Sequence, residues 1–253
     1  MTKKEIPMNP GMMTFDDIQH RLTSHQPVLP SQDQRTPASV ALILREEASG
    51  LEILFVERAA REGDPWSGDL GFPGGKVEER DENAQAAAER ETGEEIGLDL
   101  RNARYLGRLS DVAGVRLPIR VSCFVYGIKE VGLLHPSQEV REAFWVPLDS
   151  LVDPESRVTA IFHFGDEVME CPAIRLPTSE KPLLWGLTHR LLGEFLRILA
   201  SPVGKQEAEV VCECPNQECE RHADCNSCRA YHEKKGNLPF CERKENRIAV
   251  EKA

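Results

Sequence analysis

The sequence predicts an α+β fold in which a mixed β-sheet packs between helices, followed by a small Cys-rich module. The sheet is predicted from two apolar, β-rich runs, 38–44 and 51–56, which are separated by turn-forming residues at 46–50 and are typical of antiparallel strands. Helical patterns at 83–96 and 183–200 supply the layers that cover the sheet.

The helices are predicted from their end signals and from the spacing of their apolar residues. Helix 83–96 has Asn83 as N-cap and Gly97 just past its end. Helix 183–200 carries apolar residues at helical spacing, namely Leu184, Leu187, Leu191, Leu192, Phe195, Leu196 and Leu199. A weakly amphipathic stretch at 15–22 predicts a short helix near the N-terminus. Further strands are expected at 104–109, 119–128 and 143–146.

The chain is expected to consist of one core domain with a tail. Its 253 residues suit one good-sized domain and a tail. We predict an N-terminal extension with a short helix at 1–34, a central domain at 35–200 and a Cys-rich tail at 207–253.

Composition predicts a soluble, cytoplasmic protein. The chain is 40% apolar and 29% charged, and it holds no run of the roughly 20 apolar residues that a membrane-spanning helix needs. The N-terminus has two lysines but no apolar stretch behind them, so it does not predict a secretory signal. A net charge of −11 disfavours binding to long DNA or RNA, because such binding depends on neutralising phosphates.

Three glutamates on helix 83–96 indicate a metal site. Glu91, Glu94 and Glu95 stand at i, i+3 and i+4, so their carboxylates project from one face of the helix. Such close like charges need a neutralising partner, and a hard divalent cation such as Mg²⁺ or Mn²⁺ prefers carboxylate oxygens. A solvated acidic surface is the alternative interpretation.

A glycine-rich loop precedes this helix and favours the metal interpretation. The loop reads Gly71-Phe-Pro-Gly-Gly75. Glycines allow close approach of the backbone to a ligand, and Pro73 makes the entry rigid. Such a loop offers a backbone carbonyl to the metal beside the carboxylates.

The stretch 74–98 resembles the Nudix box, G-x5-E-x7-R-E-U-x-E-E-x-G-U, in which U is aliphatic. The half from Arg90 to Leu98 fits, except that Thr92 stands where an aliphatic residue is expected.

The first half of the box is one residue longer than the consensus. Counted forward from Gly75, the acidic position is Asp81; counted back from Arg90, it is Glu82. This lengthening resembles the coenzyme A pyrophosphatase branch, whose box commonly reads F-P-G-G-K. The branch's upstream motif is also similar to the segment from Arg58 through Trp66 to Gly75, although Trp66 replaces a His.

The resemblance implies a Nudix fold and a metal-dependent cut in a diphosphate linkage. Glu91, Glu94, Glu95 and the Gly75 carbonyl would hold Mg²⁺ or Mn²⁺, which lowers the pKa of a bound water. Glu94, Glu139 and Glu142 are the candidate proton acceptors. The residues expected at the substrate are Arg58, Phe72 and Gly74. For coenzyme A the products would be 3',5'-ADP and 4'-phosphopantetheine.

Arg90 has a structural interpretation as the ion-pair partner that fixes a box glutamate.

The tail predicts a structural Zn²⁺ site. Its potential ligands are Cys212, Cys214, Cys219, His222, Cys225, Cys228, His232 and Cys241. Four thiols or imidazoles suffice for tetrahedral zinc, and the Cys225-x-x-Cys228 pair gives the bite that such sites favour. Reactive thiols on a disordered tail and a redox-active pair are the alternatives. The tail recruits a partner, stabilises a homodimer or holds its metal alone.

Two classes of function remain at this point. The first is an enzyme acting on coenzyme A derivatives, ADP-ribose, dinucleotides or damaged nucleoside triphosphates. The second is a non-catalytic sensor that binds a nucleotide metabolite. The intact trio of Glu91, Glu94 and Glu95 favours the enzyme, because a binding module does not need clustered metal-binding carboxylates.

Overall fold

The computed structural model describes the chain in segments. These are residues 12–29, 34–61, 67–115, 117–164, 167–178 and 181–201, together with 228, 231, 232 and 235. The chain divides into two compact units, Met1–Ser201 and Pro202–Ala253. All helices and strands named below belong to the first unit.

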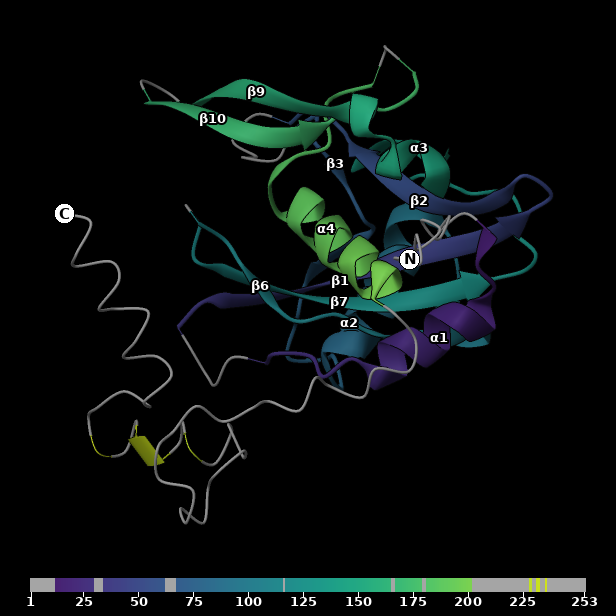
Figure 1. The fold of residues 1–253 in the computed structure, drawn as a ribbon, viewed down its shortest axis with the longest axis horizontal. Coiled ribbons are helices and arrows are strands. Elements are labelled where there is room, and N and C mark those ends of the chain that lie inside the picture. Colours follow the sequence, from purple (N-terminus) through teal and green to yellow (C-terminus); the bar gives the residue numbers. More distant parts are fainter. Residues whose placement is uncertain are drawn as a thin grey trace, which may run out of the picture. The chain divides into compact units, whose positions relative to one another are not determined.

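A mixed sheet with eight strands in the described residues forms the centre of this unit (Figure 1). Its central strand β1 (Thr36–Glu47) runs antiparallel to β2 (Gly50–Arg58) and parallel to β7 (Ile119–Ile128). The shorter or outer strands are β3 (Leu70–Gly71), β4 (Gly74–Lys76), β5 (Arg104–Arg108), β6 (Val112–Ala113) and β8 (Val140–Pro147). β3 and β8 pair with β2, β4 pairs with β1, and β5 and β6 pair with β7.

Alternation along β1 divides the core into two layers. Ala41 and Ile43 pack toward α2 (Ala84–Ile96), together with Leu54 and Val56 of β2. Leu42 and Leu44 pack on the other face, which α1 (Phe15–Ser24) and α4 (Gly186–Ala200) cover. Successive residues of a strand point to opposite faces, so one apolar strand serves both layers.

Helix α1 contributes to this core. Phe15, Ile18 and Leu22 are buried, as the amphipathic pattern predicts. The helix begins with a capping box, in which the side chain of Thr14 accepts from Asp17 N–H and the carboxylate of Asp17 accepts from Thr14 N–H.

Helix α2 has the boundaries that its end signals predict. Asn83 Oδ1 accepts a hydrogen bond from Ala86 N–H at 2.9 Å. Gly97 ends the helix in the left-handed conformation, with φ of 71°, which glycine adopts without strain. The prediction of this helix is confirmed.

Helix α4 starts later than the sequence indicates, at Gly186 instead of 183. Leu184 is paired with Ile174 by two backbone hydrogen bonds of 2.8 and 2.9 Å. This β-bridge holds the residue in an extended conformation, although its apolar side chain fits the helical spacing.

The segment between β8 and α4 contains elements that the sequence analysis missed. They are α3 (Leu148–Val152) and a two-stranded antiparallel sheet of β9 (Arg157–Phe164) and β10 (Glu167–Ile174). The hairpin lies at the upper edge of Figure 1. Single-turn 3₁₀ helices occupy Leu100–Asn102 and Pro154–Ser156.

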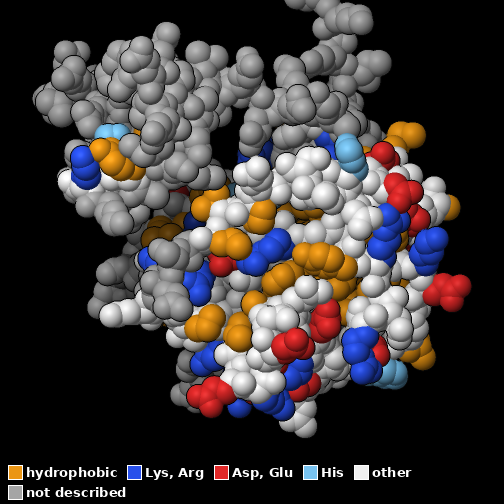
Figure 2. Space-filling view, turned by 90° about the horizontal axis from the view of Figure 1, so that it is seen from below, with side chains coloured by type: hydrophobic (Ala, Val, Ile, Leu, Met, Phe, Trp, Pro, Cys, Tyr) orange, Lys and Arg blue, Asp and Glu red, His pale blue; other side chains and the backbone are white. Residues whose placement is uncertain are grey.

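Charge is locally balanced on one face of the molecule. Acidic and basic side chains lie intermixed over the described part of the face drawn in Figure 2, with apolar side chains between them. Among the described residues, no helix has the length and apolarity to cross a membrane.

Candidate active site

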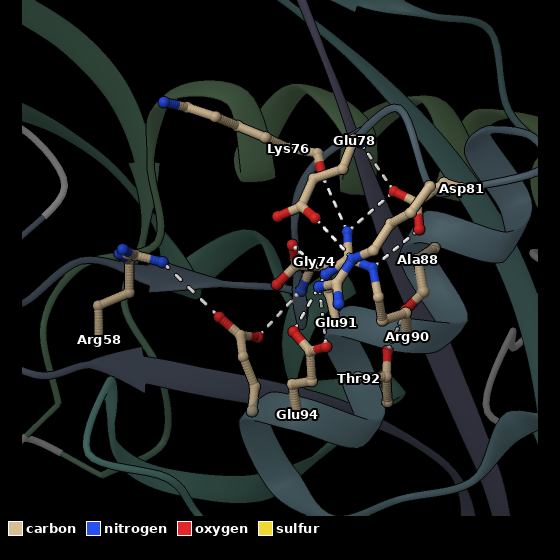
Figure 3. A network of polar contacts seen from close by, with 12 residues as sticks. Arg58, Gly74, Lys76, Glu78, Asp81, Ala88, Arg90, Glu91, Thr92 and Glu94 are labelled. Carbon is tan, nitrogen blue, oxygen red and sulfur yellow. Dashed lines mark hydrogen bonds and ion pairs between the residues drawn. The ribbon is translucent and has the colours of Figure 1, made fainter.

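The three predicted carboxylates lie on the C-terminal half of α2. Helical winding brings Glu91, Glu94 and Glu95 to one side of the helix, and Glu91 and Glu95 lie next to the turn at Gly74–Gly75. Figure 3 shows this region, with the polar contacts that join the helix to the turn.

The turn lies so close to its neighbours that it needs glycine. Gly74 and Gly75 of β4 pair with Val40 and Ser39 of β1. A Cβ on Gly74 would lie 2.2 Å from the carbonyl oxygen of Ser39. A Cβ on Gly75 would lie 2.4 Å from the carboxylate carbon of Glu91. The Glu91 carboxylate therefore packs directly on the Gly75 backbone.

Glu95 is a buried carboxylate at the same turn. Its residue is 4% exposed, and its Oε2 accepts a hydrogen bond from Gly74 N–H at 3.0 Å. Arg58 Nη1 lies 3.7 Å from its Oε1. Burial raises the pKa of Glu95 to about 7, although the Gly74 hydrogen bond and the Arg58 charge oppose this shift.

Burial also raises the pKa of Glu91, and Arg90 opposes that shift. Two of the three carboxyl groups at this turn thus lie where ionisation is disfavoured. A cation that binds them would compensate for that unfavourable charge.

Arg90 joins the loop before α2 to the glutamates. Its guanidinium donates to both carboxylate oxygens of Asp81, at 2.8 and 2.9 Å, and to the carbonyl of Lys76 at 3.2 Å. Its Nη1 also donates to Glu91 at 2.9 Å and to Glu94 at 3.0 Å. The expected ion-pair role of Arg90 is confirmed.

This pairing identifies the acidic residue of the lengthened loop. The partner of Arg90 is Asp81, the residue that counting forward from Gly75 places at the acidic position. The Arg90 guanidinium lowers the pKa of Asp81 to about 2, and the Asp81 carboxylate in turn raises the pKa of Arg90. The extra residue of the loop is accommodated while this bidentate pair is kept.

The unusual Thr92 is accommodated without an unpaired polar group. Its side chain is buried, and Oγ1 donates to the carbonyl of Ala88 one turn earlier at 2.7 Å. A threonine hydroxyl that bonds to the i−4 carbonyl fits inside a helix.

The donor set at this turn fits a hard divalent cation. The carboxylates of Glu91 and Glu94 both accept a hydrogen bond from Arg90 Nη1. A cation in the position of this nitrogen would contact the same carboxylate oxygens. In the described part of the chain, no group of three or more His, Cys, Asp or Glu side chains is arranged to hold a metal ion without some movement. Arg90 is the positive partner between Glu91 and Glu94 in the present arrangement.

The proposed proton acceptors lie in different surroundings. Glu139 is exposed, forms an ion pair with Arg61 at 3.4 Å, and contributes a negative charge near Glu95. Glu142 is bound to Lys181, which also pairs with the buried Glu57 at 3.0 Å.

Other predicted site residues lie apart from the carboxylates or outside the described segments. Phe72 is buried and stacks on Phe55, with 5.2 Å between ring centroids. Trp66 lies outside the described residues. So do most of the predicted zinc ligands, namely Cys212, Cys214, Cys219, His222, Cys225 and Cys241. Cys228 and His232 are among the described residues.

Asp69 is a supporting residue that the sequence analysis missed. Its backbone carbonyl accepts from Arg58 N–H at 3.0 Å, and its carboxylate accepts from the indole N–H of Trp185 at 3.0 Å. It thus fixes the backbone of Arg58. The partners Asp69 and Trp185 are 116 positions apart, so no local signal indicates the contact.

A family model described as the NUDIX domain matches residues 34–164. The chain belongs to the Nudix family. The mixed sheet flanked by helices is the Nudix fold, which confirms the predicted fold class.

Several curated relatives are similar over much of the chain. A probable nudix hydrolase of Schizosaccharomyces pombe is 28% identical over 74% of this chain and 66% of its own length. The human mitochondrial coenzyme A diphosphatase NUDT8 is 29% identical over 58% of this chain and 63% of its own length. An uncharacterized S. pombe protein is 29% identical over 58% of this chain and 56% of its own length. The chain thus spans between half and two thirds of these relatives.

Solved structures of similar fold include a MutT/nudix family protein from Enterococcus faecalis. It is 22% identical, with a TM-score of 0.45, over 69% of this chain and 66% of that chain. An Ap4A hydrolase from C. elegans is 21% identical, with a TM-score of 0.38, over 46% of this chain and 82% of that chain.

Proposed function

We propose that this Nudix protein is a metal-dependent pyrophosphohydrolase that cleaves the diphosphate linkage of a nucleoside-diphosphate-linked metabolite. The observation that carries the proposal is the position of Glu91 and Glu95 at the Gly74–Gly75 turn, with Glu94 joined to Glu91 through Arg90 Nη1. Two of these carboxyl groups have raised pKa values because of burial. A site that concentrates acids in this way suits divalent cations and an anionic substrate bridged by them.

The proposed ligands are Glu91, Glu94, Glu95 and the Gly75 carbonyl, with Mg²⁺ or Mn²⁺ as cofactor. When bound, the cation neutralises charge on the diphosphate and lowers the pKa of a coordinated water. Arg90, braced by Asp81, holds Glu91 and Glu94 in place. Arg58 lies at the rim of the site, 3.7 Å from Glu95, and is the proposed contact to a substrate phosphate together with the Gly74 backbone. Phe72 is the third predicted substrate residue, and its burial favours a role in supporting the turn.

We assign proton transfer to Glu139. In the reaction, a water oxygen attacks phosphorus, the bond from phosphorus to the bridging oxygen breaks, and the water proton passes to a carboxylate. Glu139 lies near enough to Glu95 to affect its pKa, and its ion-pair partner Arg61 is exposed, whereas Glu142 is paired with Lys181, which is largely buried. Glu94 is the alternative acceptor on the helix.

Coenzyme A or a derivative is the proposed substrate, giving 3',5'-ADP and 4'-phosphopantetheine. Two observations support this choice: the lengthened box with F-P-G-G-K, and the similarity to a protein named as a coenzyme A diphosphatase. ADP-ribose, dinucleotides and damaged nucleoside triphosphates are the alternative substrates.

The test is hydrolysis by the purified chain with Mg²⁺ or Mn²⁺. A panel of coenzyme A, ADP-ribose, NADH and 8-oxo-dGTP would be followed by phosphorus NMR. We expect coenzyme A to be cleaved at the diphosphate with the highest kcat/KM. Cleavage of another member would reassign the substrate. No turnover of any member would favour a metabolite sensor with the Nudix fold.

The cellular location of the protein and the metal content of its Cys-rich tail are two separate proposals. We propose a cytoplasmic location, although the relative NUDT8 is named as mitochondrial. We also propose that the Cys-rich tail holds one structural Zn²⁺. Metal analysis of reduced, purified protein should find about one zinc per chain. Folded protein free of zinc would contradict this assignment.

A further inference from the structure

The hydroxyl of Ser39 is buried beside the proposed metal site. Ser39 is 0% exposed, and among the described residues its Oγ has no hydrogen-bond partner. Buried polar groups are nearly always paired, so an unpaired hydroxyl calls for an explanation.

The sheet register places this hydroxyl on the α2 side. Side chains alternate along β1, and Ala41 and Ile43 of the same parity pack with α2. Ser39 is also directly opposite Gly75 in the β1–β4 pair. Residues directly opposite in an antiparallel pair direct their Cβ atoms to the same face, about 5 Å apart.

The α2 side chain that lies next to Gly75 is Glu91. The position of a Cβ on Gly75 is 2.4 Å from the Glu91 carboxylate carbon and 2.5 Å from its Oε1. The Ser39 Cβ is about 5 Å from the Cβ position of Gly75. The Ser39 side chain therefore lies close to the Glu91 carboxylate, which is a proposed cation ligand. At present Arg90 is the donor to Glu91, at 2.9 Å.

We propose that Ser39 is a positioning residue for the metal site, which donates a hydrogen bond to the Glu91 carboxylate when a divalent cation is bound there. A cation attracts the Glu91 carboxylate and competes with Arg90 for it, so a second donor at the buried side keeps the ligand oriented. Donors to metal-binding carboxylates commonly change metal affinity by 10- to 100-fold. This inference rests on the proposed function, because it requires a cation at Glu91.

Ser122 offers a matched control in the neighbouring strand. It is the register partner of Ser39 on β7, and it is also buried, at 8% exposure. Its hydroxyl is already engaged: it donates to Asp111 at 2.9 Å and accepts from Arg108 at 3.3 Å. Replacement by alanine removes the hydroxyl oxygen at each position. The hydroxyl of Ser39 is unpaired among the described residues, whereas that of Ser122 is hydrogen-bonded.

The experiment compares the full-length protein with Ser39→Ala and Ser122→Ala, after removal of metal with EDTA. Mn²⁺ affinity is measured by electron paramagnetic resonance, and heat stability is measured without metal. For Ser39→Ala we expect about tenfold weaker Mn²⁺ binding and a melting temperature without metal that is equal or higher, because no bond is lost. For Ser122→Ala we expect a lower melting temperature and unchanged Mn²⁺ affinity.

Two results would overturn the proposal for Ser39. One is Mn²⁺ affinity of Ser39→Ala within twofold of the unsubstituted protein. The other is a lower melting temperature of metal-free Ser39→Ala, which would show that the hydroxyl already has a partner. If the unsubstituted protein itself binds no Mn²⁺, the metal site of the proposed function is wrong, and the role of Ser39 falls with it.

Discussion

Replacement of Glu95 by glutamine should make the metal-free protein more stable at alkaline pH. Glu95 is 4% exposed, and burial raises its pKa from 4.5 to about 7. The folded state therefore binds the Glu95 proton more tightly than the unfolded state does. Between these two pKa values, the free energy of unfolding falls as pH rises. Above pH 7 it stays lower by the full amount, because Glu95 is then ionised in both states.

The size of this cost follows from the shift. Each pKa unit corresponds to about 1.4 kcal/mol, so ionised Glu95 costs the metal-free fold roughly 3 kcal/mol at pH 8. Glutamine removes the charge and keeps an oxygen for the Gly74 N–H. In a domain of this size, roughly 3 kcal/mol raises the melting temperature by about 5–10 °C.

The assay is thermal unfolding, followed by circular dichroism, of EDTA-treated protein at pH 8 and pH 5. Glu95→Gln should unfold at a higher temperature than the unsubstituted protein at pH 8, and the gap should shrink toward zero at pH 5. Glu94→Gln is the control, because Glu94 lies on the same helix and its side chain is half-exposed. Equal or lower stability of Glu95→Gln at pH 8 would refute the reasoning.

Three further predictions test separate parts of the site. Gly75→Ala should reduce Mn²⁺ affinity and kcat/KM by at least about tenfold, because its Cβ would meet Glu91 at 2.4 Å; unchanged binding in a calorimetric titration would show that the turn has room. Arg90→Lys should lower stability by about 1.5–3 kcal/mol in urea unfolding, since lysine cannot keep the bidentate pair with Asp81; an unchanged midpoint would argue against that pair. Glu139→Gln should lower kcat by about 10²–10⁴-fold with Mn²⁺ affinity kept, whereas Glu142→Gln should stay near full activity; the opposite ranking would transfer the proton-acceptor role to Glu142.

Local signals in the sequence were sufficient to predict α2. Asn83 caps its start and Gly97 ends it in the left-handed conformation, and both act within a few residues of the helix. The spacing of Glu91, Glu94 and Glu95 then fixes their common side without any tertiary information.

The contacts between distant segments were not predictable in the same way. That Asp81 and not Glu82 pairs with Arg90 depends on how the loop folds back on the helix. The proximity of Ser39 to Gly75 depends on the β1–β4 register, which no local pattern specifies. The start of α4 was mispredicted because a β-bridge between Leu184 and Ile174 outweighs helical periodicity.

The hairpin of β9 and β10 was missed for a related reason. Its strands mix apolar side chains with polar ones, and Pro172 lies inside β10, which normally disfavours a strand. In a two-stranded sheet each strand is an edge strand, and edge strands tolerate proline.

Mn²⁺ titration by electron paramagnetic resonance tests the central claim most directly. The metal-stripped protein is compared with a variant that combines Glu91→Gln, Glu94→Gln and Glu95→Gln, and coenzyme A hydrolysis is followed in the same samples. The unsubstituted protein should bind Mn²⁺ and release 3',5'-ADP, and the triple variant should do neither while it remains folded. A triple variant that binds Mn²⁺ and hydrolyses coenzyme A as the unsubstituted protein does would contradict the assignment of this site.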